Sequence, residues 1–435
     1  MKSWVTALAV VAIAVKGVAM NRKLTRRNFL KVAGTGVAGA ALLGTSACGG
    51  SDSGSPSGKV TLRWWDYWSE KADKAADVYH RRYMELNPNV KIERRVVPFD
   101  ELKRTLLQGA AAGKLPDIVA IDNPDHQSFA ALGIIQDISA QVEEWGHADD
   151  FFEGPWQSTL WQGGNFGVPD SSDCLTLWYN KDLLEDAKVE PPTNWDELKE
   201  SAAALTEGNR FGLAVSAIQT EEGTFQWLPF LWQAGADIPN IDSAGGRAAL
   251  QLWVDMVNEG SMSQGILGWD QQDVANQFMN GQAAMMINGP WEIPVVKEEA
   301  PDLNWGHVAL PKGKQNASIL GGENLAITTA CKDVDAAWDL LRWMKSPKIE
   351  KEYHIMIGTF PPREDVANDP YWTDDPVYAT YIEQLKLAKP RAYGPKYPEI
   401  SSAIQEAIQG AVSGESTVEQ ALSRAQKEIT PLLKQ

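Results

Sequence analysis

From residue 59 onward, segments with the pattern of β-strands alternate with segments that have the pattern of helices. Residues 59–65 (KVTLRWW), 90–97 (VKIERRVV) and 116–122 (PDIVAID) are rich in apolar and β-branched residues. Between them, the stretches 69–86 and 100–112 place apolar residues at helical spacing, and helix-breaking residues follow each stretch. Strands that alternate with helices form parallel βαβ units, so the chain is predicted to be an α/β protein.

A second block with the same character begins at about Leu175 and runs to about Asn288. It contains helical patterns at 194–205 and 245–258. The strand pattern returns at 305–311 (WGHVALP), after this block has ended. The chain is therefore expected to form more than one α/β unit, as its length of 435 residues also indicates.

Polar and aromatic side chains follow two of the predicted strands where each strand ends. Asp66, Tyr67 and Trp68 come directly after the first strand, and Asp122 and Asn123 follow the apolar part of the third. Ligands of open α/β sheets bind beyond the carboxyl ends of the strands, so we expect these residues to meet at one binding site. The alternative is that they pack in the core or cap the helices that follow.

The first 47 residues are predicted to be an export signal. Arg26 and Arg27 precede an apolar run at 32–43, and this order of basic, apolar and small residues is typical of a signal peptide. The paired arginines resemble the twin-arginine motif, which implies export of a folded protein. The motif TSAC resembles a lipobox, so we expect Cys48 to become a lipid-modified N-terminus on the outer face of the cytoplasmic membrane. Residues 48–58, which are rich in Gly and Ser, would form a flexible tether.

Charge and composition exclude several classes of protein. The first 47 residues contain seven of the 40 basic residues and no acidic ones, so the remainder carries 33 basic against 57 acidic residues. A surface this negative repels phosphate, which argues against a nucleic-acid partner. The five histidines are isolated, so no metal or other cofactor is expected. Whether Cys174 and Cys331 form a disulfide cannot be decided from their spacing.

Several segments, taken together, resemble one protein family. They are 168–198 (VPDSSDCLTLWYNKDLLEDAKVEPPTNWDEL), 278–293 (FMNGQAAMMINGPWEI), 321–328 (GGENLAIT), 335–347 (DAAWDLLRWMKSP) and 359–366 (TFPPREDV). Their order is similar to that in extracellular solute-binding protein family 1, the sugar-binding components of ABC importers. The resemblance covers residues 59 to 435.

The resemblance implies a type II-like periplasmic-binding-protein fold. In that fold, two α/β lobes are joined by hinge strands, and the ligand lies in the cleft between the lobes. The first lobe would comprise residues 59–170 and 305–350, and the second lobe would comprise residues 175–300 and 355–435.

The resemblance also implies roles for two residues. Trp291, in the motif NGPW, matches the tryptophan that stacks on a sugar ring in this family. Asp173 matches an acidic position that accepts hydrogen bonds from sugar hydroxyls. The lysine that maltose-binding members place after the first strand has no match in residues 66–70, which disfavours maltose as the ligand.

The residue types at these positions are suited to a sugar. The faces of a pyranose present C–H groups that stack on aromatic rings, and its hydroxyls need groups such as carboxylates, amides and guanidinium. Of the 18 tryptophans, 17 lie outside the signal, which favours a ligand with more than one ring. Further candidates, for which core packing, a turn or a structural ion pair is the alternative, are Trp227, Trp269, Glu323, Asn324 and Arg363.

The sequence therefore predicts a monomeric, lipid-anchored receptor that binds a disaccharide or oligosaccharide and delivers it to an ABC permease without catalysis. One alternative is a receptor for a polyol phosphate or another small solute, which a cation in the cleft beyond Arg363 would favour. A remote alternative is an exported glycoside hydrolase, which would need two carboxylates facing each other across the scissile bond. No local motif marks such a pair.

Overall fold

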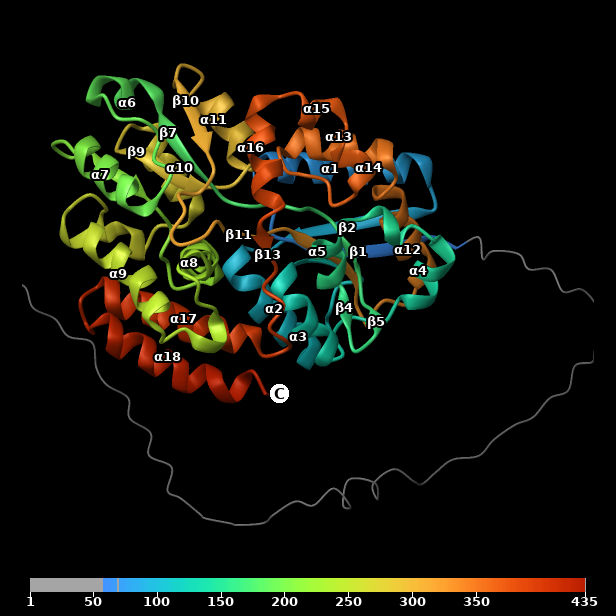
Figure 1. Ribbon diagram of the computed structural model, residues 1–435. Helices are drawn as coiled ribbons and strands as arrows, with labels where there is room; N and C mark the ends of the chain where they lie inside the picture. Colours follow the sequence, from blue (N-terminus) through green and yellow to red (C-terminus); the bar gives the residue numbers. More distant parts are fainter. Residues whose placement is uncertain (1–57, 69, 435) are drawn as a thin grey trace, which may run out of the picture. The chain divides into compact units, whose positions relative to one another are not determined.

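Figure 1 shows the computed structural model of the chain, which describes residues 58–68 and 70–434. The predicted export signal, the lipid-modified Cys48 and the tether, apart from Gly58, lie outside these residues. None of the described helices combines the length and apolar character that crossing a membrane requires.

A five-stranded sheet takes its strands from three parts of the chain. In order across the sheet, the strands are β2 (Val90–Val96), β1 (Val60–Asp66), β3 (Ile118–Asp122), β12 (Glu323–Ile327) and β6 (Val168–Pro169). β1 runs parallel to β2 and β3, as the βαβ pattern predicts, whereas β12 runs antiparallel to β3 and β6. The helices between β1 and β3 are α1 (Glu70–Leu86) and α2 (Phe99–Ala112), and α2 ends at Gly113 with φ +64°.

A second sheet has four strands. Its order is β10 (Trp305–Val308), β7 (Thr176–Asn180), β9 (Ala283–Asn288) and β8 (Phe211–Ala214), and among these neighbours β8 and β9 run parallel. The sequence analysis places residues 305–350 in the first lobe, but β10 pairs with β7 of the second sheet. The chain rejoins the first sheet at β12. The pattern at 305–311 predicted a strand but did not specify which strand it would pair with.

Helices cover both sheets (Figure 1), and apolar side chains of the helices and sheets pack together in buried clusters. Those that pack with the first sheet are α1, α2, α3 (His126–Ala131), α4 (Ser139–Trp145), α5 (Glu153–Ser158), α12 (Val334–Met344) and α13 (Pro347–Ile357). Those that pack with the second sheet are α6 (Lys181–Ala187), α7 (Trp195–Leu205), α8 (Glu221–Gln233), α9 (Ala244–Asn258), α10 (Gln271–Met279), α11 (Glu292–Glu299), α14 (Glu364–Ala367), α15 (Pro370–Thr373), α16 (Pro376–Leu385), α17 (Tyr397–Val412) and α18 (Val418–Leu432). Two further pairs of short strands are β4 (Leu160–Trp161) with β5 (Gly164–Asn165) and β11 (Ser318–Ile319) with β13 (Ala388–Lys389).

Three segments carry the chain between the two sheets. Residues 170–175 lead from β6 to β7, residues 320–322 lead from β11 to β12, and residues 358–363 lead from α13 to α14. Backbone hydrogen bonds join these crossing segments to one another. Asp173 and Gly321 exchange two such bonds, at 2.8 and 3.3 Å, and Ser172 N–H donates to the Phe360 carbonyl at 2.9 Å.

The two cysteines within the described residues do not form a disulfide. Cys174 and Cys331 are both free and buried. Cys174 packs in the core of the second sheet, and Cys331 packs in the core of the first.

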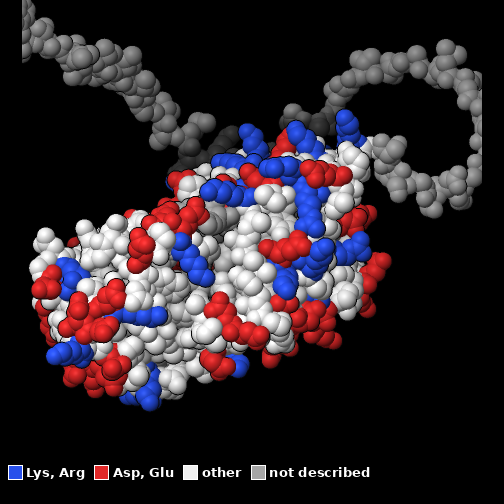
Figure 2. Space-filling view, turned by 90° about the horizontal axis from the view of Figure 1, so that it is seen from above, with Lys and Arg blue, Asp and Glu red and all other residues white. Residues whose placement is uncertain are grey.

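Charged side chains of both signs are interspersed on the face of the molecule that Figure 2 shows. Basic side chains are densest toward one end of this face, where acidic side chains lie among them, and uncharged areas lie between the charged groups.

We expect Gly322→Ala to destabilise the protein by about 2–4 kcal/mol. Gly322 has φ +112°, and a Cβ at this position would lie 2.2 Å from the Ser171 carbonyl oxygen of the neighbouring crossing segment. Urea unfolding followed by tryptophan fluorescence measures the loss.

Gly133→Ala is the matched control, because Gly133 has φ +68° but no atom within 4 Å of the added Cβ. We expect Gly133→Ala to destabilise the protein by only about 1 kcal/mol, because the unfavourable backbone conformation of alanine is the single cost there. Equal losses in the two variants would contradict the steric argument for Gly322.

Candidate functional site

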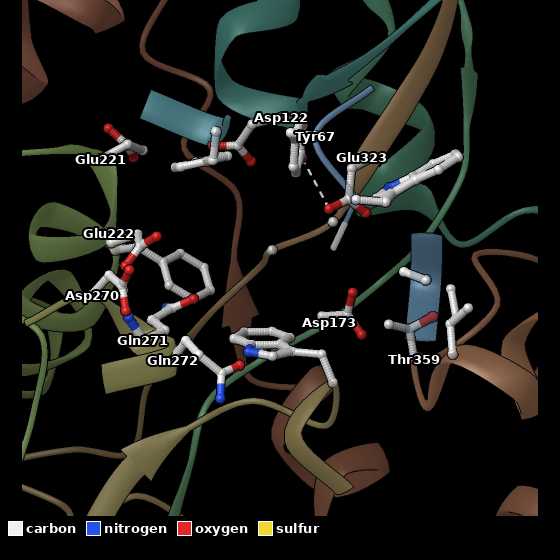
Figure 3. Close-up of a pocket in the computed structure, with 18 of the residues that line it drawn as sticks. Tyr67, Asp122, Asp173, Glu221, Glu222, Asp270, Gln271, Gln272, Glu323 and Thr359 are labelled. Carbon is white, nitrogen blue, oxygen red and sulfur yellow. Dashed lines mark hydrogen bonds between the residues drawn. The ribbon is translucent and has the colours of Figure 1, made fainter. Parts of the chain in front are cut away.

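A cavity of about 530 Å³ lies between the two sheets, within the ~300–1,000 Å³ range typical of ligand pockets. One wall comes from the ends of β3 and β12 and the residues that follow β1. The opposite wall comes from the first turns of α8 and α10, and the crossing segments complete the lining. Figure 3 shows how side chains from these elements surround the cavity.

The first sheet contributes polar side chains where its strands begin or end. Asp122, the last residue of β3, is in register with Glu323, the first residue of β12, because the two strands are antiparallel. Tyr67 follows β1, and its hydroxyl donates to Glu323 Oε1 at 2.9 Å (Figure 3). The Ser171 hydroxyl donates to Glu323 Oε2. Two hydroxyl groups therefore fix the orientation of the Glu323 carboxylate on the cavity wall.

Aromatic rings line the same cavity. Trp291 is partly exposed, and its ring centroid lies 6.3 Å from that of Phe225. A Cβ at Gly289 would lie 2.1 Å from the Trp291 indole, so glycine allows the ring to fold back over the chain. Tyr67 and Phe99 meet edge to face with their centroids 5.0 Å apart. The cavity thus offers flat apolar surfaces beside its carboxylates.

Two helices of the second sheet direct their N-terminal ends at the cavity. The Thr220 hydroxyl caps α8 by accepting from Glu222 N–H, and the Asp270 carboxylate caps α10 by accepting from Asp273 N–H. Gln271 N–H donates to Glu222 Oε2 at 2.8 Å, which connects the two helix starts. Helix N-termini carry partial positive charge, so this wall can hold both carboxylates and the electron-rich oxygens of a ligand.

Arg391, which lies between β13 and α17, is the one basic residue among those that line the cavity. Its guanidinium donates to both oxygens of Asp122, at 3.0 and 3.2 Å, and to Glu221 Oε1 at 2.6 Å. It also donates to Asn123 Oδ1 at 3.3 Å and lies over the Phe225 ring at 4.8 Å. Its charge is therefore shared between two carboxylates from opposite walls.

The cavity wall is strongly acidic, with eight acidic side chains against the single Arg391. Burial raises the pKa of Asp122 to about 7 even though Arg391 opposes the shift. Burial also raises the pKa of Glu222 to about 7, and burial together with nearby Glu323 raises the pKa of Asp173 well above its usual range. The carboxyl groups of Glu222 and Asp173 can therefore hold protons near neutral pH, and then donate as well as accept hydrogen bonds. Among residues 58–68 and 70–434, no three His, Cys, Asp or Glu side chains are arranged to hold a metal ion.

The structure brings half of the predicted ligand-binding residues together at this cavity. Those that line it are Tyr67, Trp68, Asp122, Asp173, Trp291 and Glu323. Those that the structure places elsewhere are Asp66, Asn123, Trp227, Trp269, Asn324 and Arg363.

Asp66 lies inside the first lobe because its side chain points toward the core. It is fully buried and accepts from Arg94 at 2.6 and 2.7 Å and from the Trp64 indole at 2.7 Å. Trp68 reaches the cavity with only 6% of its surface exposed, since most of the ring packs near Trp64. The cluster at the end of β1 is thus mainly structural, and Tyr67 is its most direct contribution to the cavity.

Side-chain alternation removes Asn324 from the cavity. Glu323 faces the cavity, so the next residue of the strand points to the opposite side, where Asn324 and Ser158 are joined by a hydrogen bond at 2.9 Å. Asn123 lies behind the wall and accepts from Arg391. Arg363 is buried in ion pairs outside the cavity, with carboxylates at 2.8 and 2.9 Å.

The two remaining tryptophans pack in the core of the second sheet. Trp227 is fully buried, because it lies on the face of α8 opposite Glu221 and Phe225. Trp269 is partly buried among apolar residues and lies against Gly265, while the next residue, Asp270, reaches the cavity.

The wall formed by α8 and α10 and the residue Arg391 were not predicted from the sequence. The rule that predicted Asp122 also applies to the second sheet, because α8 follows the carboxyl end of β8 and starts with Glu221 and Glu222. A strand prediction at 211–214 would have found them. Arg391 follows a two-residue strand in a proline-containing loop, and no local pattern marks it.

Comparisons with known proteins agree on one family. The family described as bacterial extracellular solute-binding protein matches residues 78–380. A maltotriose-binding protein of Pyrococcus abyssi is 25% identical over 394 residues, covering 86% of this chain and 82% of that protein. An ABC transporter solute-binding protein of Thermotoga lettingae, bound with α-D-tagatose, is 26% identical with a TM-score of 0.81, over 86% of this chain and 100% of that one. The maltose-bound MalE3 of T. maritima gives the same identity, TM-score and coverage.

The substitution Glu222→Gln tests the electrostatic cost of the acidic wall. The pKa of Glu222 is about 7 in the folded state, whereas its ordinary value is 4.5. Between these pH values the folded protein therefore binds more protons than the unfolded protein does. The contribution of Glu222 to the stability of the wild type therefore falls as pH rises from about 4.5 to about 7. We expect Glu222→Gln to be about 1–3 kcal/mol more stable than wild type at pH 8 and about equal at pH 4.5, as measured by urea unfolding.

The exposed Glu143 provides the control, since Glu143→Gln should leave the difference between the two pH values unchanged. A Glu222→Gln variant that lost stability equally at both pH values would contradict this electrostatic argument.

Proposed function

Because the chain belongs to the family of bacterial extracellular solute-binding proteins, we propose that it is the sugar receptor of an ABC importer. In this proposal it binds a disaccharide or oligosaccharide in the cavity between the sheets and delivers it to a membrane permease. The observation that carries the proposal is the combination of partly exposed aromatic rings and buried carboxylates in one cavity. The names of the similar proteins, for maltotriose, maltose and tagatose, also support a sugar.

The chemistry of the two walls supports a ring with hydroxyl groups at its rim. Trp291 would stack on the face of a sugar ring, with Phe225 beside it and Tyr67 on the opposite wall. Asp173 and Glu222 would accept from hydroxyls or, when protonated, donate to them. The volume of about 530 Å³ supports a ligand larger than one ring.

Binding between two lobes provides a way to report the ligand to a permease. Closure of the lobes around a ligand excludes water and changes the surface that a partner meets, a behaviour typical of periplasmic binding proteins. The crossing segments are the places where the backbone must bend during such a motion. The protein would act as a monomer and would not alter the sugar chemically.

The acidic wall disfavours the alternative ligand, a polyol phosphate or another anion. Arg363 lies outside the cavity and Arg391 is a cation inside it, but Asp122 and Glu221 already share the charge of Arg391. The cavity therefore has no uncommitted cation among the described residues that line it, and a phosphate would meet eight acidic side chains. The remote alternative, an exported glycoside hydrolase, is disfavoured because the family is described as solute-binding proteins. An assay for sugar release would detect such an activity.

Tryptophan fluorescence and thermal shift, measured across a panel of ligands, test the proposal. The panel contains maltose, maltotriose, other disaccharides and oligosaccharides, monosaccharides and glycerol phosphate. A ligand that binds the folded state raises the melting temperature by mass action. A saturable response to a disaccharide or oligosaccharide supports the proposal, and a response to glycerol phosphate alone contradicts it.

We expect Trp291→Ala to weaken binding of the responding sugar by about tenfold to a hundredfold, because the main stacking surface is lost. Trp291→Phe should retain most of the affinity, since an aromatic face remains. Isothermal titration calorimetry measures both variants. Trp161→Ala, which removes a partly buried tryptophan outside the cavity, should bind as wild type does. Unchanged affinity in Trp291→Ala would overturn the stacking role.

We also propose that the protein is anchored to the outer face of the membrane by a lipid on Cys48, after export through the twin-arginine route. Replacing Cys48 by Ala should move the protein from the membrane fraction to the soluble exported fraction. Replacing Arg26 and Arg27 together by Lys should leave it inside the cell. Fractionation followed by immunoblotting measures both effects, and membrane retention of Cys48→Ala would contradict the anchor.

A further inference from the structure

Arg391 joins elements that belong to different lobes. Its segment leads from β13 to α17, which packs in the core of the second sheet. One of its carboxylate partners, Asp122, ends β3 in the first sheet, and the other, Glu221, begins α8 over the second sheet. The guanidinium therefore bridges the two walls of the cavity directly.

The Glu221 side of the bridge is itself held in place. The Tyr397 hydroxyl donates to Glu221 Oε1 at 2.7 Å, and the Ser401 hydroxyl donates to Glu221 Oε2. Both donors lie on α17. The contacts thus form a continuous path from β3 through Arg391 to the N-terminal turns of α8 and α17.

The bridge is buried, which makes its contacts strong and their loss costly. Arg391 is 3% exposed, and Phe225 covers one face of the guanidinium at 4.8 Å. Charge-assisted hydrogen bonds with the two-pronged geometry seen at Asp122 are stronger than neutral ones, and separation of a buried pair leaves uncompensated charges. Other arginine pairs, such as those of Arg63 with Asp117 and Arg247 with Asp242, stay within one lobe.

We propose that Arg391 is a positioning residue that ties the two lobes together across the cavity and so sets the separation of the two cavity walls. This inference rests on the proposed function only in taking the cavity as the ligand site. Opening of the lobes must break the contacts of Arg391 with either Asp122 or Glu221. The bridge therefore raises the population of the narrow, binding-competent arrangement, and this raises apparent affinity without requiring a contact to the ligand.

Hydrogen exchange of the full chain, without any sugar, tests the bridge. In Arg391→Gln we expect amides at 122–126 in the first lobe and at 220–225 in the second to exchange roughly tenfold faster, because one buried charged contact no longer opposes local opening. Amides of β1 and β9 should keep their rates. Arg391→Lys should be intermediate, since an ammonium keeps the charge but cannot form the two-pronged contact.

Two further variants separate the bridge from a purely local role. Glu221→Gln keeps the shape of the side chain and should also accelerate exchange at 122–126, although it lies in the other lobe. Arg94→Gln, which removes a guanidinium paired entirely within the first lobe, should leave 220–225 unchanged. Acceleration confined to 388–397 in Arg391→Gln, or none at all, would overturn the proposal.

Because this measurement uses no ligand, its outcome is independent of the sugar titrations. Faster exchange on both walls with no response to any sugar would support the bridge and contradict the proposed function. Sugar binding, with faster exchange confined to the loop of Arg391, would support the proposed function and contradict the bridge.

Discussion

The backbone hydrogen bonds among the three crossing segments are the constraint on which the rest of the structure depends. Asp170 N–H donates to the Glu323 carbonyl at 2.6 Å, and Asp173 pairs with Gly321 in both directions. The buried Lys345 ammonium holds the Asp170 carboxylate at 2.6 Å, so the first crossing is also anchored by charge. Because the crossing segments are hydrogen-bonded to one another, they hold the two sheets next to each other, and the cavity forms beside these segments.

The same crossings decide the chemistry of the cavity. They place the Asp173 carboxylate in the cavity lining. The residues at 321 and 322, where the crossing segments approach each other most closely, are both glycines. The result is a narrow space in which carboxyl groups lose water and their pKa values rise. A cavity of this kind is poorly suited to an anion and well suited to a neutral ligand with many hydroxyls, because carboxyl groups such as those of Asp173 and Glu222 can act as donors or acceptors.

Sequence analysis was most successful where a local rule carries the information. Tyr67 and Asp122 were predicted from their positions after strands, and the structure places both at the cavity. The same rule included Asp66 and Asn123, which are neighbours of these residues but are buried. Asp66 is the last residue of β1 and points to the core, and Asn123 starts the short 3₁₀ helix that follows β3. The position after a strand therefore finds the correct loop but does not decide which of its side chains reach the ligand site.

By itself, the sequence determined the alternation of strands and helices, several helix ends, and the family. The alternation and the helix ends arise from backbone preferences and apolar spacing within about 20 residues, whereas the family was inferred from the resemblance of several motifs along the chain. Only the tertiary structure decided that β10 joins the second sheet, that Trp227 packs in the core, and that Arg391 bridges Asp122 and Glu221. The physical reason is distance along the chain: Arg391 and Asp122 are 269 residues apart, and only folding brings them into hydrogen-bonding contact.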